Sequence, residues 1–422
     1  MHLYNPLTRT SHTLNEESDP AGRPVTIYVC GITPYDTTHL GHAFTYTSAD
    51  ILIRYLEHRG RPVIYVQNVT DIDDDILRKA GEIGSDWLTI GNQWTSHYIQ
   101  DMIALNVRPP EHYPRATDVI PEIVEMVAAL LAKGVAYEKN GSVYFHTAAW
   151  PEFGRLSGLA PDRLLATANE RGNRPEDANK RDPLDFVLWQ AQAPGEPAWE
   201  SPWSAGRPGW HIECSTMATK YLGQTIDIHS GGSDLLFPHH SCEIAQVEPL
   251  TDRPFVRFWM HAAMVRHAGE KMSKSLGNLV WVRDLLKTHS ADALRIYLGL
   301  HHYSIEWSHS PGLLEWAGRL AERLQSAVNQ PEGAKSALDP TPWENAFNQA
   351  LDDNLNTPIA LAAMDELAIQ ILLGARLGCS LGRAQAGLRR MGTVFGLVLG
   401  NDGPESRVSA GWQTHLARFS VS

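Results

Sequence analysis

One stretch, residues 25–43, constrains the fold of this chain more than any other. It begins with alternating β-branched and aromatic residues, which predict a strand that reaches Cys30. A glycine and a proline then break the pattern, and a helical run follows over residues 43–56. Three residues of the intervening turn are candidate helix caps: Asp36, Thr37 and Thr38.

The next apolar run, Pro62–Val69, predicts a second buried strand. A strand, a helix and another strand within residues 25–69 form the βαβ pattern of a parallel sheet. Ligands of such sheets bind beyond the carboxyl ends of the strands. We therefore expect Cys30, the turn of His39 and His42, and the polar run 70–75 to meet at one edge.

The composition narrows the classes of protein to consider. A chain of 422 residues with 43% hydrophobic and 20% charged residues is typical of a soluble protein of roughly two to four domains. No apolar run approaches the length of a membrane span and no signal peptide is visible, so we expect a cytoplasmic location. The net charge of −12 argues against nonspecific nucleic-acid binding.

Changes in composition divide the chain, in this prediction, into six segments. A polar stretch and a Pro/Trp-rich stretch mark an insertion between two halves of the sheet, and the last part of the chain is helical. The expected segments are the first half of the sheet domain (1–133), a connective insertion (134–208), the second half of the sheet domain (209–265), a loop junction (266–310), a helical bundle (311–400, with its last helix over 384–399) and a loose tail (401–422).

The four cysteines are too few and too scattered for a disulfide framework, so they are buried thiols or ligands. His239 and Glu243 share one face of a predicted helix, while Cys242 points away from that face. Together with Cys30 and Cys214, His239 and Glu243 form a chemically sound set of zinc ligands. By spacing alone, ordinary burial of these residues is the better interpretation. The rival ligands are His240, His229 and His211.

Two further motifs suggest phosphate chemistry. His39-Leu-Gly41-His42 lies at a strand-to-helix turn, where imidazoles and a glycine favour a bound nucleotide. Lys271-Met-Ser-Lys274-Ser275 lies on a predicted loop that could close on a triphosphate. Each motif alone is weak evidence, since such loops are usually solvated turns. Their combination and order are strong evidence for nucleotidyl transfer.

These two motifs resemble those of class I aminoacyl-tRNA synthetases, and other motifs resemble the cysteinyl-tRNA synthetases within that class. The supporting motifs include Asn68-Val-Thr-Asp-Ile-Asp-Asp74, Gly206-Arg-Pro-Gly-Trp-His-Ile-Glu-Cys-Ser215 and Gly231-Gly-Ser-Asp-Leu-Leu-Phe-Pro-His-His240. The resemblance implies an α/β fold with a Rossmann-like doubly wound parallel sheet, followed by a helical bundle. It also implies a short form that stops about where an anticodon-binding module would begin.

The resemblance assigns roles to individual residues. It implies one zinc ion on Cys30, Cys214, His239 and Glu243, and Mg²⁺ with ATP. The implied catalytic residues are His39, His42, Lys271 and Lys274, and the implied ATP-binding residues are Gly31, Gly41, His42, Gly231, Gly232 and Lys274. The implied cysteine-binding residues are Thr33, Thr70, Trp210 and Asp234, although core packing is the alternative for Trp210.

A zinc ion would explain how cysteine is told from serine. The two differ by one atom, which a shape-reading pocket discriminates poorly, whereas zinc binds a soft thiolate far better than a hydroxyl. The implied reaction is therefore activation of L-cysteine to cysteinyl-adenylate. No editing insertion is evident in the chain.

The acceptor is the open question. We expect tRNA(Cys), and the alternative is glucosaminyl-inositol, because a short ligase of the mycothiol pathway resembles Thr33–His42 and Tyr65–Val69 equally well. Glu243, a ligand that we expect the amino-sugar ligase to lack, favours tRNA. Arg383, Arg389 and Arg390 could face its phosphates, although a solvated helical face is the better interpretation.

Two other classes of protein deserve comparison with this prediction. A zinc-containing regulatory module without catalysis is disfavoured by intact His39, His42, Lys271 and Lys274. A small-molecule nucleotidylyltransferase shares the histidine turn but not the late lysine loop. We expect a monomeric enzyme, an AMP-forming cysteine ligase, with no membrane partner.

Overall fold

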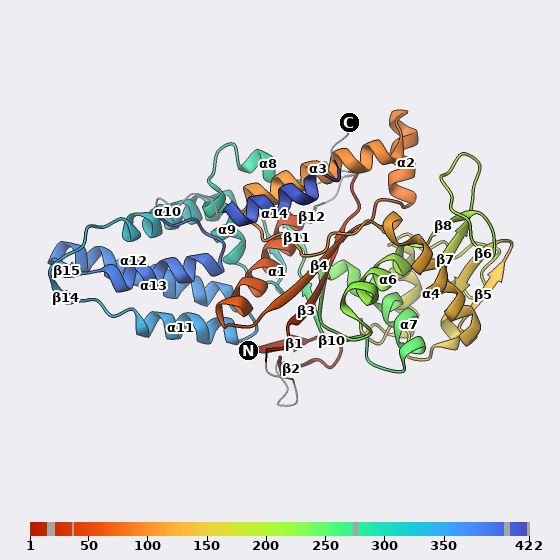
Figure 1. The fold of residues 1–422 in the computed structure, drawn as a ribbon, viewed down its shortest axis with the longest axis horizontal. Helices are drawn as coiled ribbons and strands as arrows, with labels where there is room; N and C mark the ends of the chain where they lie inside the picture. The colour runs from red at the N-terminus through yellow and green to blue at the C-terminus, as the bar shows by residue number, and fades with distance from the viewer. Residues whose placement is uncertain (15–21, 36–37, 273–276, 401–405, 420–422) are drawn as a thin grey trace.

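The computed structural model describes residues 1–14, 22–35, 38–272, 277–400 and 406–419. A four-stranded parallel sheet forms its centre, in the order β10-β9-β3-β4 (Figure 1). The strands are β3 (Val25–Ile32), β4 (Val63–Val69), β9 (Ile226–Gly232) and β10 (Val256–Ala262). The predicted parallel α/β sheet is confirmed.

The βαβ unit predicted from the opening stretch is present. Helix α1 (Leu40–His58) connects β3 to β4, and both strands are almost continuously buried, as expected for a sheet covered on both faces. The predicted cap is wrong. His39 caps α1, because its Nδ1 accepts hydrogen bonds from the backbone N–H groups of Gly41 and His42. Thr38 is buried without this role, and Asp36 and Thr37 lie outside the described residues.

The outer edge of β4 is covered by residues 111–115, the edge segment, which follows α2 (Asp74–Ile83) and α3 (Trp87–Ala104) in the chain. Residues 111–115 run parallel to β4, with Val66 paired to His112 and Val69 paired to Arg115. The backbone N–H of Gln67 donates to His112 O at 3.2 Å, and that of Val69 donates to Pro114 O at 2.9 Å. This edge segment blocks further strand pairing at β4.

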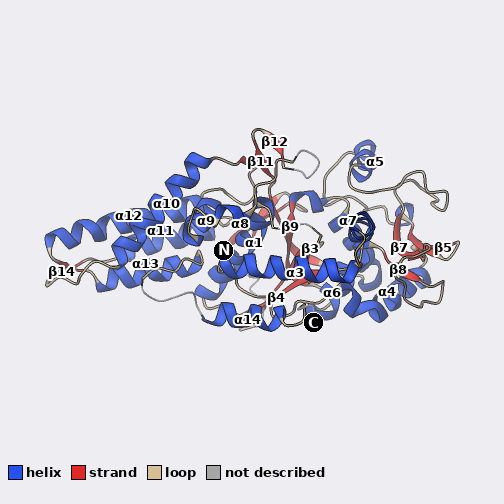
Figure 2. Cartoon of the chain, turned by 90° about the horizontal axis from the view of Figure 1, so that it is seen from above, coloured by secondary structure: helices blue, strands red, loops and turns tan. Residues whose placement is uncertain are grey.

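The predicted insertion is a separate small layer beside the sheet (Figure 2). Its antiparallel sheet has the order β5-β6-β7-β8 and follows α4 (Ile120–Lys133). Its elements are β5 (Ala136–Lys139), β6 (Ser142–Phe145), α5 (Pro161–Asn169), β7 (Phe186–Ala191) and β8 (Gly206–Pro208).

The parallel sheet then resumes. In chain order, helix α6 (Trp210–Leu222) precedes β9 and helix α7 (His239–Thr251) follows it, and the two helices contact each other. After β10 the chain forms a small sheet of β11 (Val265–His267), β12 (Glu270–Lys271) and β13 (Trp307–Ser308), with α8 (Val282–Leu285) and α9 (Ala291–Gly299) between them. A hairpin of β1 (His2–Asn5) and β2 (Thr10–Thr13) stands at the N-terminus.

The helical part and the insertion lie on opposite sides of the parallel sheet (Figure 2). It contains α10 (Pro311–Val328), α11 (Thr341–Asp352), α12 (Thr357–Leu377) and α13 (Gly382–Val394), with a pair of short strands, β14 (Lys335–Ala337) and β15 (Cys379–Ser380). Helix α13 ends five residues before the predicted Leu399, because Gly396 adopts a left-handed conformation with φ 65°.

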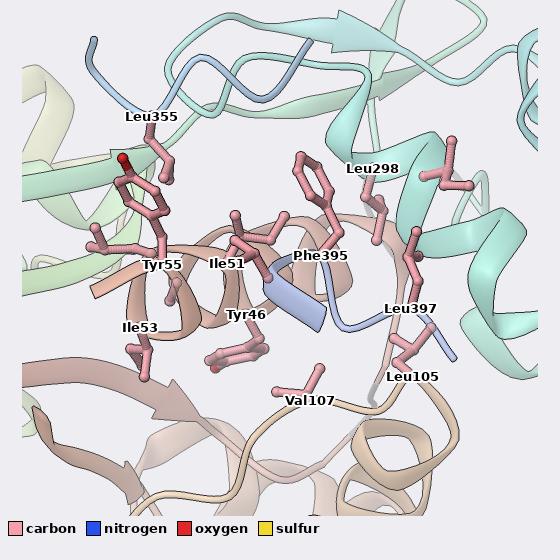
Figure 3. Packing of buried hydrophobic residues seen from close by; sticks show 14 of the residues in the cluster. Tyr46, Ile51, Ile53, Tyr55, Leu105, Val107, Leu298, Leu355, Phe395 and Leu397 are labelled. Carbon is pink, nitrogen blue, oxygen red and sulfur yellow. The ribbon is translucent and has the colours of Figure 1, made fainter. Parts of the chain in front are cut away.

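The catalytic and helical parts share one apolar core. Side chains of α1, such as Ile51 and Tyr55, belong to one cluster with Leu298 of α9, Leu355 before α12, and Phe395 and Leu397 after α13. Figure 3 shows Tyr55 beside Leu355. The helical part is therefore fixed to the helix that begins at the His39 turn.

Helix α12 corrects one expectation from composition. Among the described residues, it alone is long and apolar enough to cross a membrane by length and composition, with a mean hydropathy of 1.5 over an 18-residue window. It packs against α10, α11 and α13, and 44% of that window is buried.

The predicted loose tail is also wrong for the residues that the structure describes. Residues 406–416 form α14 (Ser406–Leu416), which lies along α3 (Figure 1). Trp412 is fully buried, and its indole N–H donates to Val107 O at 2.7 Å. His415 Nε2 lies 2.9 Å from Pro110 O, and Arg418 donates to Tyr113 O at 3.0 Å. This C-terminal strap, residues 406–419, holds the edge segment against the sheet.

Candidate active site

A cavity of about 1160 Å³ opens at the carboxyl ends of the parallel strands. Its sheet-side wall consists of residues at or just beyond the carboxyl ends of these strands, namely Gly31 on β3, Thr33 after β3, Asp73 after β4, Gly232 on β9 and Ala262 on β10. The facing wall comes from the insertion. The cavity thus lies where the topology of an open parallel sheet predicts a ligand.

A buried cluster of potential metal ligands forms one end of this cavity. One ligand atom each from Cys30, Cys214, His239 and Glu243 lies within 4.8 Å of every other. Cys30 lies near the carboxyl end of β3, Cys214 is on α6, and His239 and Glu243 are four apart on α7. Cys30 and His239 also line the cavity. The cluster could hold a metal ion that faces a bound ligand.

The distances between donor atoms in the cluster fit tetrahedral coordination of a metal ion. The sulfurs of Cys30 and Cys214 are 3.9 Å apart, Cys30 Sγ lies 3.8 Å from Glu243 Oε1, and His239 Nε2 lies 3.2 Å from that oxygen. Metal–sulfur bonds of about 2.3 Å and metal–nitrogen or metal–oxygen bonds of about 2.0–2.1 Å give tetrahedral edges of about 3.8, 3.6 and 3.4 Å, respectively. These three edges therefore differ from a tetrahedral arrangement by only about 0.1–0.2 Å.

The neighbouring histidines support this set. His211 Nδ1 lies 2.9 Å from His239 Nδ1, which leaves the Nε2 of His239 to face the cluster. His229 Nε2 lies 2.9 Å from the second oxygen of Glu243, Oε2. Such outer partners orient metal ligands. Of the rival ligands, His211 and His229 thus occupy outer positions around the set.

A second, overlapping set of four exists. Cys30, His229, His240 and Glu243 also have ligand atoms within 4.8 Å of one another. His240 Nδ1 is 2.8 Å from His261 Nε2, which leaves its Nε2 to face Cys30 Sγ at 3.4 Å. His229 Nε2, in contrast, is already at hydrogen-bonding distance from Glu243 Oε2. Of the two sets, the first contains both sulfurs. Cys242 is buried and lines the cavity but belongs to neither set.

Burial shifts the pKa values of two of these ligands, His239 and Cys30. It lowers the pKa of His239 well below its ordinary value, so the imidazole is neutral and can bind a cation. It also raises the pKa of the Cys30 thiol, with Cys214 and Glu243 adding to the effect. A metal ion would reverse this last effect by favouring the thiolate and releasing a proton.

The turn of His39 and His42 forms another part of the wall. The two imidazoles stack, with ring centroids 3.8 Å apart, and Gly41 lies between them on the first turn of α1. All three residues line the cavity. Because α1 begins here, the positive end of its dipole favours an anion at this place.

The lysine-containing segment is joined to this turn by backbone hydrogen bonds. Leu40 N donates to Val280 O at 2.8 Å, and Val282 N donates to Thr38 O at 3.2 Å. Met272 lines the cavity. The backbone of Lys271 belongs to β12, while Lys274 and its serine neighbours lie outside the described residues. Of the lysine motif, Met272 therefore lies on the wall of the same cavity as the His39 turn.

The predicted amino-acid pocket is assembled only in part at the cavity wall. Thr33, Trp210 and Asp234 line the cavity, and the Trp210 ring lies 4.4 Å from the ring of His239. Thr70 does not line it. It is 2% exposed, and its hydroxyl accepts a hydrogen bond from the Asn68 amide at 3.2 Å. Of the four predicted ATP-binding glycines, Gly31, Gly41 and Gly232 line the cavity, whereas Gly231 is buried and does not line it.

The comparison with protein families decides the assignment of the chain. The model of the tRNA synthetases class I (C) catalytic domain matches residues 17–318, and that of the DALR domain matches residues 346–400.

This chain belongs to the class I (C) tRNA synthetases.

Curated relatives of this synthetase family agree with the assignment. The chain is 44% identical to the cysteine–tRNA ligase of Alkalilimnicola ehrlichii over 97% of its own length and 88% of that protein. It is also 43% identical to the L-cysteine:1D-myo-inositol 2-amino-2-deoxy-alpha-D-glucopyranoside ligase of Thermomonospora curvata, over 89% of each chain. The predicted resemblance to the synthetase family is confirmed.

Solved structures agree at the level of the fold. A Mycobacterium tuberculosis methionyl-tRNA synthetase in complex with methionyl-adenylate matches with a TM-score of 0.65 and 14% identity, over 94% of this chain and 93% of that one. At this identity the likeness concerns the fold alone. It confirms the class I synthetase architecture of the sheet with an attached helical part.

The three arginines considered for tRNA phosphates have partners within the helical part. Arg383 lies 3.7 Å from Asp339, and Arg390 donates to Glu344 at 2.6 Å. Arg389 donates to the backbone oxygen of Val328 at 2.6 Å. These contacts support the alternative interpretation, an ordinary helical face.

Several cavity residues were not predicted. Arg171, Lys180 and Arg207, all from the insertion, line the cavity. The Arg171 guanidinium donates to the backbone oxygens of Asp234 and Phe237, and so ties the insertion to the segment before His239. A possible signal was the density of arginine, asparagine and aspartate over residues 169–182, which exceeds what a plain linker requires.

Proposed function

We propose that this synthetase-family protein activates L-cysteine with ATP and ligates it to tRNA(Cys). The observation that carries the proposal is the buried cluster of two thiols, an imidazole and a carboxylate at one end of the nucleotide cavity. The printed function of the Alkalilimnicola relative, cysteine–tRNA ligase, supports it over nearly the whole chain. The enzyme is thus an AMP-forming ligase.

We propose zinc as the resident ion on Cys30, Cys214, His239 and Glu243. Their mixed sulfur, nitrogen and oxygen donors and near-tetrahedral spacing support zinc among the common ions. When bound, it would supply a soft Lewis acid that prefers the thiolate of cysteine to the hydroxyl of serine. The protein contributes the burial that excludes water and the outer histidines that orient the ligands.

The chain's own residues would bind and orient the nucleotide. ATP lies, in this proposal, across Gly41, with His39 and His42 at its phosphates and Gly31, Gly231 and Gly232 allowing the nucleoside to approach. His39 Nδ1 already accepts hydrogen bonds from the backbone N–H groups of Gly41 and His42, so its ring is held in a fixed orientation. Magnesium, bound with ATP, would neutralise charge on the pyrophosphate.

The amino acid would be held beside the nucleotide. Asp234 takes the substrate ammonium, while Thr33 and Trp210 border the substrate on the cavity wall. Thr70 acts from behind this wall. The substrate carboxylate then attacks the α-phosphate, the bond to pyrophosphate breaks, and Lys271 and Lys274 stabilise the charge that develops.

We propose tRNA(Cys) as the acceptor of the activated cysteine. Glu243 completes the four-residue cluster, and the sequence comparison sets tRNA ligases beside this chain at 43–46% identity. The second candidate is transfer to the amine of glucosaminyl-inositol, which is favoured by the Thermomonospora relative with its matched length. We propose that the protein is a monomer and acts in the cytoplasm. We also propose that its segments end at residues 133, 208, 265, 310 and 400.

The two acceptors can be separated in one experiment. The purified protein receives cysteine and ATP, and AMP release is measured with a tRNA(Cys) transcript or with glucosaminyl-inositol. We expect AMP release that depends on tRNA, and cysteine attached to its 3′ end. Release that depends only on the amino sugar would replace the first candidate by the second.

A further inference from the structure

The strand that ends at the metal cluster contains an irregularity. Val29 of β3 pairs with Gln67 of β4, but the next pair is Ile32 with Val69. Between these pairs β3 advances by three residues and β4 by two, so Cys30 and Gly31 form a β-bulge. A bulge of this kind turns side chains that would otherwise alternate regularly, and it commonly stands next to active sites.

Side chains hold the peptide group between Cys30 and Gly31 at both of its ends. The Gly31 N–H donates to Asn68 Oδ1 at 2.8 Å, and the Tyr46 hydroxyl donates to Cys30 O at 3.2 Å. Asn68 is fully buried and Tyr46 is 4% exposed. The direction of Cys30 is therefore set by two side chains in addition to the sheet.

Asn68 also connects this peptide to the second strand of the site. Its amide nitrogen donates to Thr70 Oγ1 at 3.2 Å, and Thr70 N donates to Ile32 O at 3.0 Å. The strands are so close that a side chain at Gly31 would put its Cβ 1.6 Å from the Asn68 backbone oxygen. Little room remains for the bulge to shift while Asn68 is in place.

We infer that Asn68 is a positioning residue for cysteine recognition, acting through the Cys30–Gly31 peptide and the Thr70 hydroxyl. Asn68 is not on the cavity wall, whereas Cys30, Gly31, Ile32 and Thr33 are. Its loss would leave a buried N–H without its acceptor and free the peptide to rotate. Metal–ligand distances lie within about 0.2 Å of their ordinary values, so rotation of the peptide next to Cys30 would disturb the geometry of the cluster. The inference rests on the proposed function.

The test compares Asn68→Ala with a matched control, Asn5→Ala. Asn5 is also buried, donates to Arg257 O at 2.8 Å and accepts from Leu7 N at 3.2 Å, but it lies on β1 away from the cavity. Cysteine-dependent ATP–pyrophosphate exchange is measured with each variant. We expect Asn68→Ala to raise the KM for cysteine by about 10- to 100-fold and the KM for ATP by less than about threefold. The control should keep both KM values.

A second variant removes the opposite hold on the same peptide. Tyr46→Phe keeps the ring and loses only the hydroxyl that donates to Cys30 O. We expect the KM for cysteine to rise by about three- to tenfold, and the metal to pass to a chelator faster than from the unchanged protein. This variant decides the matter if Asn68→Ala proves insoluble.

Failure of the inference differs from failure of the proposed function. Absence of cysteine-dependent exchange in the unchanged protein would overturn the proposed function and this inference with it. Normal exchange in that protein, with the KM for cysteine unchanged in the soluble variants at Asn68 and Tyr46, would overturn the inference alone. Equal changes in both KM values, matched by the Asn5 control, would also overturn it.

Discussion

Replacement of Asp50 by asparagine should destabilise the protein far more than its size suggests. Asp50 is on α1, the helix that begins at the His39 turn, and is 2% exposed. It accepts from Arg54 Nε at 2.9 Å, from the backbone N–H of Arg108 at 2.8 Å and from Arg295 of α9. Arg295 also donates to Phe395 O, so this cluster joins α1 to the helical part.

The magnitude follows from the charge that the substitution leaves behind. Asparagine keeps the volume of Asp50 and one acceptor oxygen, but the guanidinium of Arg295, which is fully buried, loses its counter-charge. Removal of one partner from a buried ion pair costs about 3–5 kcal/mol. We therefore expect the free energy of unfolding of Asp50→Asn to fall by about this amount.

Urea unfolding followed by tryptophan fluorescence measures this loss. The matched control is Asp284→Asn, which breaks an exposed pair with Lys287 at 2.6 Å and should cost about 0–1 kcal/mol. A loss for Asp50→Asn no larger than that of the control would refute the reasoning.

The same cluster predicts a pH dependence. Burial opposes ionisation of Asp50, but Arg54, Arg295 and the backbone N–H of Arg108 outweigh it, so its pKa lies below the ordinary value. A carboxyl group of this kind stabilises the fold above its unfolded pKa of about 3.9, and the contribution is lost as the pH falls through the lower folded pKa. The difference in stability between the unchanged protein and Asp50→Asn should therefore narrow below about pH 4. A constant difference from pH 7 to pH 3 would contradict this account.

Three further predictions concern the site and the strap. Cys214→Ala should lose both zinc and cysteine affinity, and full zinc occupancy by elemental analysis would remove Cys214 from the ligand set. Lys274→Ala should slow cysteine-dependent ATP–pyrophosphate exchange by orders of magnitude, and an unchanged rate would exclude its proposed role. Trp412→Ala should cost about 3–5 kcal/mol, because a fully buried indole leaves a cavity and a broken hydrogen bond to Val107 O. A tail without structural importance would instead leave the urea midpoint unchanged.

The βαβ unit was predictable because its signals are local. Strands β3 and β4 are apolar runs bounded by turn residues, and such runs must be buried on both faces of a parallel sheet. Helix boundaries were less predictable. The cap of α1 is His39, whereas sequence rules favour serine, threonine, aspartate and asparagine, since imidazole caps are uncommon.

The metal cluster was not predictable from spacing. Cys30 and Cys214 are 184 residues apart in the sequence, and only the return of α6 and α7 to the sheet brings their sulfurs to 3.9 Å. The resemblance to the synthetase family supplied the set, and the fold supplies its geometry. Thr70 illustrates the limit of such transfer, because it lies behind the cavity wall.

The C-terminal strap escaped prediction because its stability is tertiary. Residues 406–419 have few strong local signals, and their order depends on Trp412 and Phe419 packing around Tyr113. A polar, glycine-containing segment close to a chain end reads as a loop when this packing is unknown. The buried tryptophan was the one available signal.

The central claim is that the cluster of Cys30, Cys214, His239 and Glu243 recognises the sulfur of cysteine. The most direct measurement compares cysteine with serine in ATP–pyrophosphate exchange, with the zinc-loaded protein and with the protein after zinc removal. We predict a cysteine preference well above the roughly 200-fold that shape alone provides, and its collapse into that range when zinc is removed. Discrimination that stays equally high without zinc would contradict the claim.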